Sequence, residues 1–374
     1  MNLNLDGTKI SLPIHAERLR AFLAGERIAP VTIDMALTQK CQAACRFCYA
    51  GLQQNPSDPV AWETWSNFLD DCVEIGHKPG EGVKAISLVS DGESTLSKSY
   101  YKFIEKAKSL GIDIANGTNG EALKKEMMPL LVDSLTYLRI NLNAATSEEN
   151  AKIMGTTDKF FPRVIDNVRE LVRLKRERNA HCTIGLQMVL MPDYADQVVP
   201  LAKFGSTLGV DYLVIKHCSD DEAGRLGVDY AWYRSEEATA LLHEAEAQST
   251  ADYQVSVKWS KIKTGRDREY SKCYGTALHL QMSGTGIVAP CGSFFHARYK
   301  RHHIGDIKET RFRDIWASQA YRDVIDYLKS EHFDPRKECA TLCLQDRSNL
   351  ALFNLIEKGE ALPMANDNAH RNFL

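Results

Sequence analysis

Three cysteines within eight residues constrain this chain more than any other feature of its sequence. Cys41, Cys45 and Cys48 form a C-x₃-C-x₂-C loop directly after VTIDMAL (31–37), whose apolar and β-branched residues predict a strand. The N-terminal residues lack the charged-then-apolar pattern of a secretion signal, so a disulfide framework explains the ten cysteines poorly. Clustered thiols in such a chain are expected to bind metal or to take part in catalysis.

The spacing of these thiols indicates which metal group they would bind. Three thiolates can ligate three corners of a cubane iron–sulfur cluster and leave the fourth iron without a protein ligand. An open metal position can take atoms of a substrate or cofactor, as in catalytic metal sites. A zinc ion would normally need a fourth ligand nearby, and neither His nor Cys occurs between Cys48 and Cys72. A cluster with one open iron is the favoured interpretation, and a zinc loop or free thiols is the alternative.

Short apolar runs alternate with amphipathic segments in the first 220 residues. The alternation predicts about six β/α units, hence a parallel sheet covered by helices, with ligand chemistry at the C-terminal strand ends. Six units are fewer than the eight of a closed barrel, so an α/β partial barrel or an open sheet is expected. Strands are expected at 31–37, 83–90, 112–120, 135–144, 182–191 and 210–218, and helices at 61–76, 99–111, 160–178 and 197–209.

The pattern changes after about residue 250, where a small α+β domain with four cysteines is expected. The net charge of −3 gives no bulk attraction to nucleic acid or to an anionic membrane. No apolar run approaches the ~20 residues of a membrane span. We therefore expect a cytoplasmic protein that binds neither nucleic acid nor a membrane. The expected domains are a lead-in at 1–30, the partial barrel at 31–250, the cysteine-containing domain at 251–350 and a tail at 351–374.

The first cysteine loop resembles the signature of the radical S-adenosylmethionine (SAM) superfamily. That family places C-x₃-C-x₂-C after the first strand of a partial (β/α)₆ barrel, commonly with an aromatic residue before the third cysteine, as Phe47 is here. The resemblance implies a [4Fe–4S] cluster on Cys41, Cys45 and Cys48, with the amino and carboxylate groups of SAM on the open iron. It also implies reductive cleavage of SAM to methionine and a 5′-deoxyadenosyl radical, which abstracts a hydrogen atom from substrate.

Other positions resemble the SAM-binding motifs of this family. Asp-Gly-Glu at 91–93 is similar to the family's Gly-Gly-Glu, which receives the SAM amino group, but Asp91 departs from the first glycine. Thr-Asn-Gly at 118–120 resembles the motif at the next strand end, although it is also a common turn. A polar side chain at 141 stands where relatives carry a serine that touches SAM, and a purely structural role is its alternative. The implied cofactor contacts are Phe47, Gly92, Glu93, Asn119, Asn141 and Gln187.

The C-terminal cysteines resemble the SPASM and twitch extensions of radical SAM enzymes. Gly286 and Cys291 form a G-x₄-C, and twelve residues separate Cys273 from Gly286, as in the opening of such domains. Four thiolates suffice for one fully ligated [4Fe–4S] cluster, so the shorter twitch type fits better than a full SPASM domain. The closing pair is C-x₃-C rather than C-x₂-C, and a Cys₄ zinc site is the alternative. The expected ligands are Cys273, Cys291, Cys339 and Cys343.

The second cluster suggests the reaction. A fully ligated auxiliary cluster has no open iron, so its expected role is to accept one electron from a substrate radical. Loss of that electron and of a proton turns a substrate radical at a carbinol carbon into a ketone, as in an aminocyclitol dehydrogenase of the family. The expected substrate is a small polar metabolite such as a sugar, amino sugar or aminocyclitol. An electron donor such as flavodoxin or ferredoxin is the implied partner.

Several alternatives remain open at this stage. Cys218 ends the strand 210–218 on the same face as Lys216, and a thiol there could donate a hydrogen atom to a substrate radical, giving epimerisation. A buried Cys is also a common core residue. Peptide modification is a further possibility, although the family's peptide-modifying members commonly carry a longer N-terminal domain. From another class, the chain could be a non-catalytic Fe–S or zinc scaffold, which would not cleave SAM.

Overall fold

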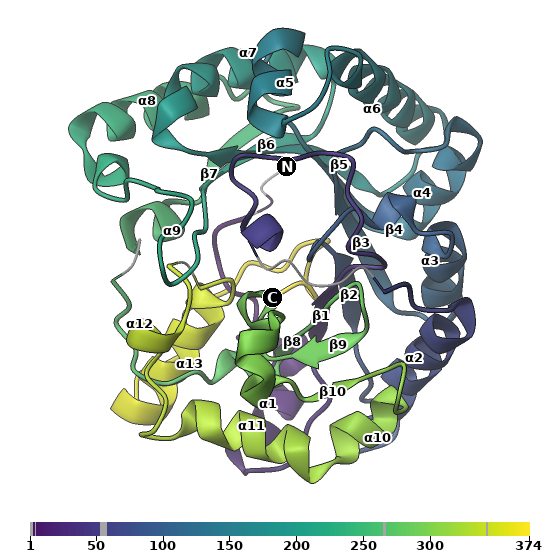
Figure 1. Cartoon of the computed structure of the whole chain (residues 1–374), viewed down its shortest axis with the longest axis vertical. Coiled ribbons are helices and arrows are strands. Elements are labelled where there is room, and N and C mark those ends of the chain that lie inside the picture. Colours follow the sequence, from purple (N-terminus) through teal and green to yellow (C-terminus); the bar gives the residue numbers. More distant parts are fainter. Residues whose placement is uncertain (1–2, 4, 53–57, 265–266, 342) are drawn as a thin grey trace.

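The structure is a computed structural model that describes residues 3, 5–52, 58–264, 267–341 and 343–374. One ten-stranded sheet with the order β10-β9-β8-β1-β2-β3-β4-β5-β6-β7 runs through it. Figure 1 shows this sheet curving into an incomplete ring with helices on its outer side. The strands are β1 Thr32–Met35, β2 Ala85–Leu88, β3 Asp113–Thr118, β4 Leu135–Asn141, β5 Thr183–Leu190, β6 Tyr212–His217, β7 Gln254–Val257, β8 His279–Met282, β9 Ile287–Ala289 and β10 Gly305–Asp306.

The helices bury apolar stripes against the outer face of this sheet. In the longest helix, Val164, Val168 and Leu171 follow the i, i+4, i+7 spacing and are fully buried. No helix among the described residues is long and apolar enough to cross a membrane. The helices are α1 Ala16–Leu23, α2 Trp62–Glu74, α3 Tyr100–Ser109, α4 Met128–Ser134, α5 Ser147–Met154, α6 Phe160–Glu177, α7 Val198–Leu208, α8 Glu236–Glu246, α9 Trp259–Thr264, α10 Phe312–Ala317, α11 Gln319–Lys329, α12 Pro335–Glu338 and α13 Asp346–Lys358.

The predicted α/β fold with an open, partial barrel is confirmed, and the sheet extends beyond the six predicted units. β7 pairs in parallel with β6, and β8 pairs in parallel with β1, so two short strands after residue 250 flank the predicted ones. β9 and β10 then add antiparallel strands to β8. The cysteine-rich C-terminal region is therefore continuous with the barrel sheet and stands next to β1, the strand that leads into the first cysteine loop.

The C-terminal end of the chain lies inside the ring (Figure 1). Phe373 packs with Tyr137 on the inner side of the sheet, and the His370 imidazole lies 2.7 Å from Thr183 Oγ1 at the start of β5. Thr32 Oγ1, at the start of β1, donates a hydrogen bond of 2.6 Å to the Asn372 carbonyl. The C-terminal segment thus covers the end of the barrel where the parallel strands begin. Access to the inner face is left to the opposite end, where the cysteine loops lie.

A buried carboxylate joins the barrel to the C-terminal region. Asp71 on α2 is fully buried and accepts two hydrogen bonds from the Arg311 guanidinium, at 2.5 and 3.0 Å, just before α10. Phe68 of α2 packs edge-on against Phe312 of α10, with ring centroids 5.0 Å apart. The paired charges and the aromatic contact together hold α10 on the outside of α2.

We expect Asp71→Ala to lower the free energy of unfolding by about 2–3 kcal/mol, because charged hydrogen bonds are lost while the Arg311 guanidinium can still reach solvent. Urea unfolding at fixed pH measures the change. Asp70→Ala is the matched control, since Asp70 forms only a half-exposed ion pair with Lys106, which is worth less than about 1 kcal/mol. Equal losses in the two variants would contradict the role assigned to Asp71.

Candidate active site

The first cysteine loop lies after β1, at the C-terminal end of the barrel strands. Backbone hydrogen bonds of 3.0 Å from Ala44 and Arg46 to the carbonyls of Met154 and Ile153 hold it on the end of α5. The helix ends at Gly155 with φ +60°, and a Cβ there would stand 2.4 Å from the Ala44 carbonyl oxygen. Only glycine allows the loop to approach α5 so closely.

The three thiols of this loop are free, and their environment disfavours unligated thiolates. Cys41 is exposed, whereas Cys45 and Cys48 are half-buried. Burial raises the pKa of all three, and the neighbouring Cys48 and Cys41 raise that of Cys45 further. Since a coordinating metal deprotonates a thiol outright, a bound cluster would remove this cost.

The thiols are not closed around a single ion. No group of three or more His, Cys, Asp or Glu among the described residues is arranged to hold one metal ion. The sulfurs that ligate different corners of a cubane stand farther apart than the ligands of one ion, so this arrangement suits a cluster better than zinc. The donor set itself, three free thiols in one loop, fits the chemistry of the predicted cluster.

The tripeptide at 91–93 packs against the chain that leads into this loop. Gly92 has φ +96°, and a Cβ there would lie 2.2 Å from the Thr38 carbonyl oxygen. The Glu93 amide donates a 2.9 Å hydrogen bond to the Lys40 carbonyl, next to Cys41. Gly92 is therefore needed for the close approach, and Glu93 is carried to the base of the cysteine loop.

The Glu93 carboxylate is fixed by the motif at the next strand end. Its Oε1 accepts hydrogen bonds of 2.7 Å from the Thr118 and Thr95 hydroxyls, and its Oε2 accepts one of 2.7 Å from the Asn119 amide. Burial raises the pKa of Glu93, and these donors oppose the shift. Asn119 in turn directs its Nδ2 toward Cys41 Sγ, 3.9 Å away. The structure thus joins the two motifs and the first cysteine.

Asp91, the departure from the family motif, connects the barrel to the C-terminal region. Its carboxylate accepts hydrogen bonds from Gln39 Nε2 at 2.6 Å, from Ser283 Oγ at 2.7 Å and from the Gly284 amide at 2.9 Å. Gln39 leads into the first cysteine loop, and Ser283 follows β8. This link could not be predicted from the sequence, because its only signal is an acidic residue in place of a glycine, which does not indicate a partner.

The other two predicted cofactor contacts lie on neighbouring strands. Asn141 at the end of β4 is in register with Gln187 of β5, and Gln187 Nε2 donates a 2.7 Å hydrogen bond to Asn141 Oδ1. Both side chains lie on the inner face of the sheet. Phe47 is buried, and its carbonyl oxygen lies 3.5 Å from Cys218 Sγ.

Cys218 lies directly behind the first cysteine loop. Its side chain is fully buried, and its Sγ is directed at the carbonyl oxygens of Phe47 and Ser219, each 3.5 Å away. Burial and the neighbouring Asp220 raise the pKa of the thiol to about 12. The thiol is therefore protonated at neutral pH, as a hydrogen donor must be, but it is also packed as a core residue would be.

The four C-terminal cysteines form a second half-buried set of free thiols. Burial raises the pKa of each, and the charges of the set act on one another: Cys273 raises the pKa of Cys343, which is about 12. Arg268 opposes the shift at Cys339 and Cys343, and its guanidinium donates to the carbonyls of Pro335 and Ala340. The arginine thus holds the closing C-x₃-C segment and favours thiolates there.

The closing segment also contacts the loop after β6. The Thr341 amide donates a 3.1 Å hydrogen bond to the Asp220 carbonyl, and the Asp220 amide donates one of 2.9 Å to Thr341 Oγ1. Asp220 follows Cys218 by two residues. The loop after β6 therefore touches both cysteine sets, which places the second set beside the open end of the barrel.

Comparison with known proteins agrees with this arrangement. The Radical SAM superfamily model matches residues 35–204, and the SPASM iron–sulfur cluster-binding domain model matches residues 273–344. The "tungsten-containing aldehyde ferredoxin oxidoreductase cofactor-modifying protein" of Pyrococcus furiosus is 19% identical over 77% of this chain and 81% of its own length. The "AdoMet-dependent heme synthase" of Methanosarcina barkeri is 21% identical over 77% of this chain and 82% of its own.

Solved structures share the fold. Streptococcus suis SuiB bound to S-adenosylmethionine superposes with a TM-score of 0.63 at 18% identity, over 84% of this chain and 72% of its own. The anSMEcpe structure with bound AdoMet gives a TM-score of 0.53 at 14% identity, over 86% and 85%. Fold and cysteine sites define a cluster-binding α/β barrel enzyme. The chain belongs to the radical SAM superfamily and carries a C-terminal SPASM domain.

Family membership identifies the bound groups. The radical SAM domain implies a [4Fe–4S] cluster and SAM, and the SPASM domain implies an auxiliary Fe–S cluster. The donor sets on the two cysteine loops fit these groups, because each consists of free thiols and no competing imidazole or carboxylate closes a single-ion site in the described residues.

Proposed function

We propose that this chain is a SAM-cleaving oxidoreductase that oxidises an alcohol of a small polar metabolite. When bound, the first cluster and SAM supply a 5′-deoxyadenosyl radical that takes a hydrogen atom from the substrate, and the auxiliary cluster accepts one electron. The alcohol loses in total one hydrogen atom from its carbinol carbon, one electron, and the proton of its hydroxyl group, and becomes a carbonyl compound. The observation that carries the proposal is the second set of four thiols beside the barrel mouth, which leaves no open iron for binding substrate.

The position of each group of residues indicates which bound group it would hold. Cys41, Cys45 and Cys48 hold the first cluster at the strand ends, and the Glu93 carboxylate beside them receives the amino group of SAM. The amide pair Asn141 and Gln187 faces the cofactor from the inner wall of the barrel. Cys273, Cys291, Cys339 and Cys343 hold the auxiliary cluster, and an external donor such as flavodoxin or ferredoxin supplies electrons to the first cluster.

Two alternatives to alcohol oxidation of a small metabolite, epimerisation and a peptide substrate, each have one supporting observation. Epimerisation is kept because the protonated Cys218 thiol lies 3.5 Å from the Phe47 carbonyl of the cluster loop, although its full burial favours a packing role. A peptide substrate is kept because SuiB has also been solved with its precursor peptide SuiA. Cys218→Ala separates the first candidate from oxidation, because it would stop an epimerase and leave a dehydrogenase active.

The direct test is anaerobic purification and reconstitution, followed by iron and sulfide analysis and measurement of dithionite-driven 5′-deoxyadenosine formation. We expect about eight iron atoms per chain, the content of two cubanes, together with SAM cleavage. About four iron atoms with cleavage would leave the auxiliary cysteines without a cubane and would contradict the oxidation. No cleavage by iron-loaded protein supplied with substrate candidates would favour a scaffold.

Glu93→Gln should weaken SAM binding at least about tenfold, the equivalent of one charged hydrogen bond. The amide keeps the size of the side chain but removes the negative charge, and one of its two ends no longer accepts hydrogen bonds from the 118–119 motif. Equilibrium binding of SAM to the reconstituted enzyme measures the effect. Glu126→Gln, at an exposed carboxylate in the same region, is the control. Unchanged SAM affinity in folded E93Q would refute the assignment.

A further inference from the structure

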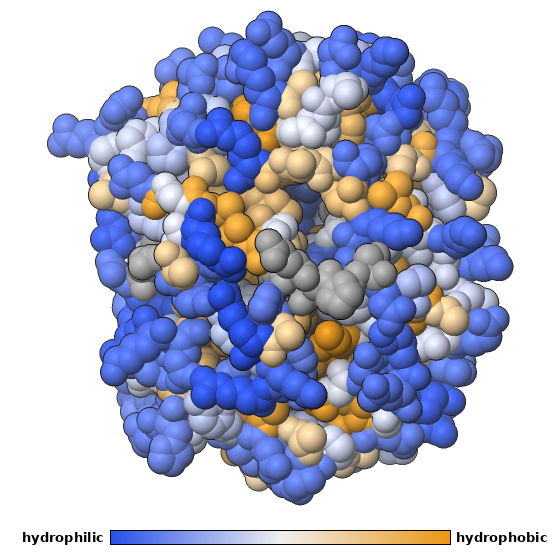
Figure 2. Space-filling model, in the orientation of Figure 1, coloured by the Kyte–Doolittle hydropathy of each residue, from blue (hydrophilic) through white to orange (hydrophobic). Residues whose placement is uncertain are grey.

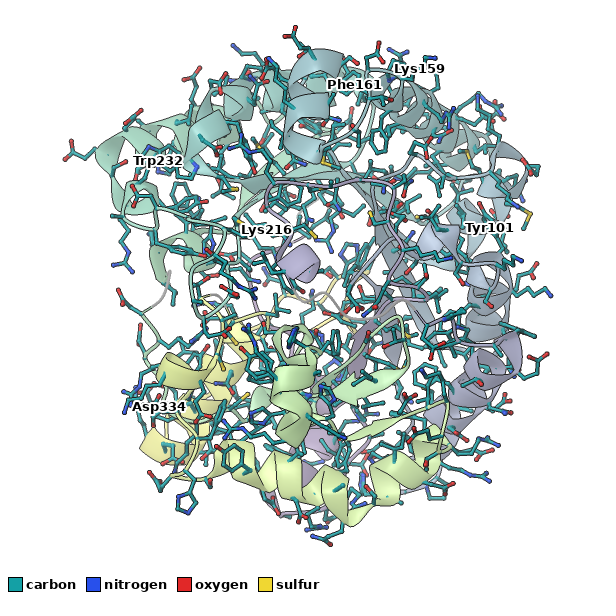
Figure 3. All side chains as sticks on the ribbon, in the orientation of Figure 1. Tyr101, Lys159, Phe161, Lys216, Trp232 and Asp334 are labelled. Carbon is teal, nitrogen blue, oxygen red and sulfur yellow. The ribbon has the colours of Figure 1, made fainter. Side chains whose placement is uncertain are left out.

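Three cations point to the inside of the barrel from neighbouring strands. Lys216 of β6 and Lys258, which directly follows β7, succeed the paired residues Ile215 and Val257 and therefore stand side by side. Ile215 and Val257 are buried on the outer face, so the two lysines point inward by strand alternation. Figure 3 shows Lys216 within the ring of strands. Arg139 of β4 joins them, two residues before Asn141 on the same face.

These cations lack acidic partners. None of the three forms an ion pair with a carboxylate among the described residues, although all are half-buried. The Arg139 guanidinium stacks on Tyr137 at 5.0 Å, and its buried Nε has no hydrogen-bond partner in the described part of the chain. Burial, together with the charges of Lys261 and Arg139, lowers the pKa of Lys216 to about 7, and the same causes lower the pKa of Lys258, so a bound anion would restore charge to both lysines. Adjacent like charges cost stability, so an arrangement of this kind calls for a bound anion.

Two acidic groups, Asp34 and Asp6, act on these cations, but both also have other partners. Asp34 of β1 faces the cations across the barrel, and its carboxylate lies 3.0 Å from His279 Nε2. Asp6 accepts hydrogen bonds of 2.8 and 2.6 Å from the amide and hydroxyl of Ser260. Lys261 on α9 is a fourth cation near Lys216 and Lys258; burial lowers its pKa, and Cys343 opposes that shift. The basic groups inside the barrel therefore outnumber the acidic ones.

We propose that Arg139, Lys216 and Lys258 bind a carboxylate or phosphate group of a small-molecule substrate inside the barrel. This inference rests on the proposed function and narrows its substrate class to anionic metabolites. Amino sugars and aminocyclitols carry positive charge at neutral pH and would be repelled by the same three groups. An Arg guanidinium with two flanking ammonium groups suits an oxyanion with several acceptor oxygens.

The test measures ligand binding to the reconstituted, SAM-loaded enzyme by calorimetry and by thermal unfolding. The probes are inorganic phosphate, succinate and putrescine, a dication with the same four-carbon chain as succinate. We expect phosphate or succinate to bind and raise the melting temperature, and the better of the two identifies phosphate or carboxylate as the group recognised. Putrescine should do neither.

Lys216→Gln and Lys258→Gln should each weaken binding of that anion about tenfold, while Lys263→Gln, at an exposed lysine of α9, should not. Without anion, the first two variants should unfold at the same or a higher temperature, because they relieve like-charge repulsion. If the lysine had a merely structural role, its substitution would lower the unfolding temperature.

Absence of binding by both anions, tighter binding of putrescine, or preference for an acidic peptide would overturn the proposal. So would loss of SAM affinity in K216Q, which would assign these cations to the cofactor. Formation of 5′-deoxyadenosine is assayed separately, so failure of the proposed function is distinguishable from failure of this inference.

Discussion

Cys41→Ala is expected to abolish SAM cleavage, lowering 5′-deoxyadenosine formation at least about 100-fold, because two thiolates cannot hold a cubane that the protein otherwise ligates at only three corners. Cys41 is exposed and contacts Asn119, so its loss removes a cluster ligand without opening a cavity in the core. Dithionite-driven assays of wild-type and variant enzyme, reconstituted side by side, measure the change.

The control for this prediction is Cys182→Ala. Cys182 is buried in the core just before β5, outside both cysteine sets, and its thiol donates a 3.7 Å hydrogen bond to the neighbouring Thr183 carbonyl. We expect the control to keep SAM cleavage even where it unfolds at a lower temperature. Unimpaired turnover in C41A would remove the first cysteine loop from the chemistry.

The local motifs could be predicted from the sequence because their function depends on short-range geometry. A C-x₃-C-x₂-C loop brings three thiols together whatever surrounds it, and parallel strands bring the 91–93 and 118–120 motifs to the same sheet edge. The contact of Glu93 with the Asn119 amide, at 2.7 Å, follows from that rule once β2 and β3 pair. The prediction therefore needed only the strand order of neighbouring β/α units.

The long-range pairings could not be predicted in this way. The alternation of apolar residues in β8 is the same whether it pairs with β1 or with β9, and it pairs with both. The Asp91–Ser283 contact spans 192 residues of sequence, and no pattern near either residue indicates the other. The burial of Phe373 inside the barrel could not be predicted either, because a polar C-terminal tail that ends in a few apolar residues is equally typical of an exposed tail.

The cations inside the barrel show most clearly what could not be predicted from the sequence alone. The two-residue periodicity of a strand predicts that Lys216 lies on the same face as Cys218. It does not indicate that this face is the inside of the barrel, or that Lys258 lies beside Lys216. That required the register of β6 with β7, a strand outside the predicted six. The proposed preference for an anionic metabolite over an amino sugar therefore rests on tertiary placement rather than on a motif.

Cys291→Ala is expected to separate the two clusters. Loss of one ligand from a set of four should lower the iron content from about eight to about four atoms per chain, because the first cluster keeps its three thiolates. SAM cleavage should continue, since the 273–344 region contributes no thiol to the first loop. Oxidation of substrate should be lost, because the substrate radical then has no electron acceptor and must regain a hydrogen atom instead.

Ser293→Ala is the matched control for this variant. Its hydroxyl oxygen accepts a 3.7 Å hydrogen bond from the Cys291 thiol, and the hydroxyl would donate to the sulfur once that thiol is deprotonated, but it forms no bond to a metal. This variant should therefore keep all its iron and its oxidation, with at most a shifted reduction potential, because hydrogen bonds to ligating sulfurs tune the potential of a cluster. If C291A kept full oxidation, the electron would have to leave by another route, and the auxiliary cysteines would serve structure rather than redox chemistry. If C291A instead lost SAM cleavage together with iron, the two sites would be coupled. Asp91 offers a structural path for that coupling, because it is hydrogen-bonded both to Ser283 in the C-terminal region and to Gln39 before the first cysteine loop.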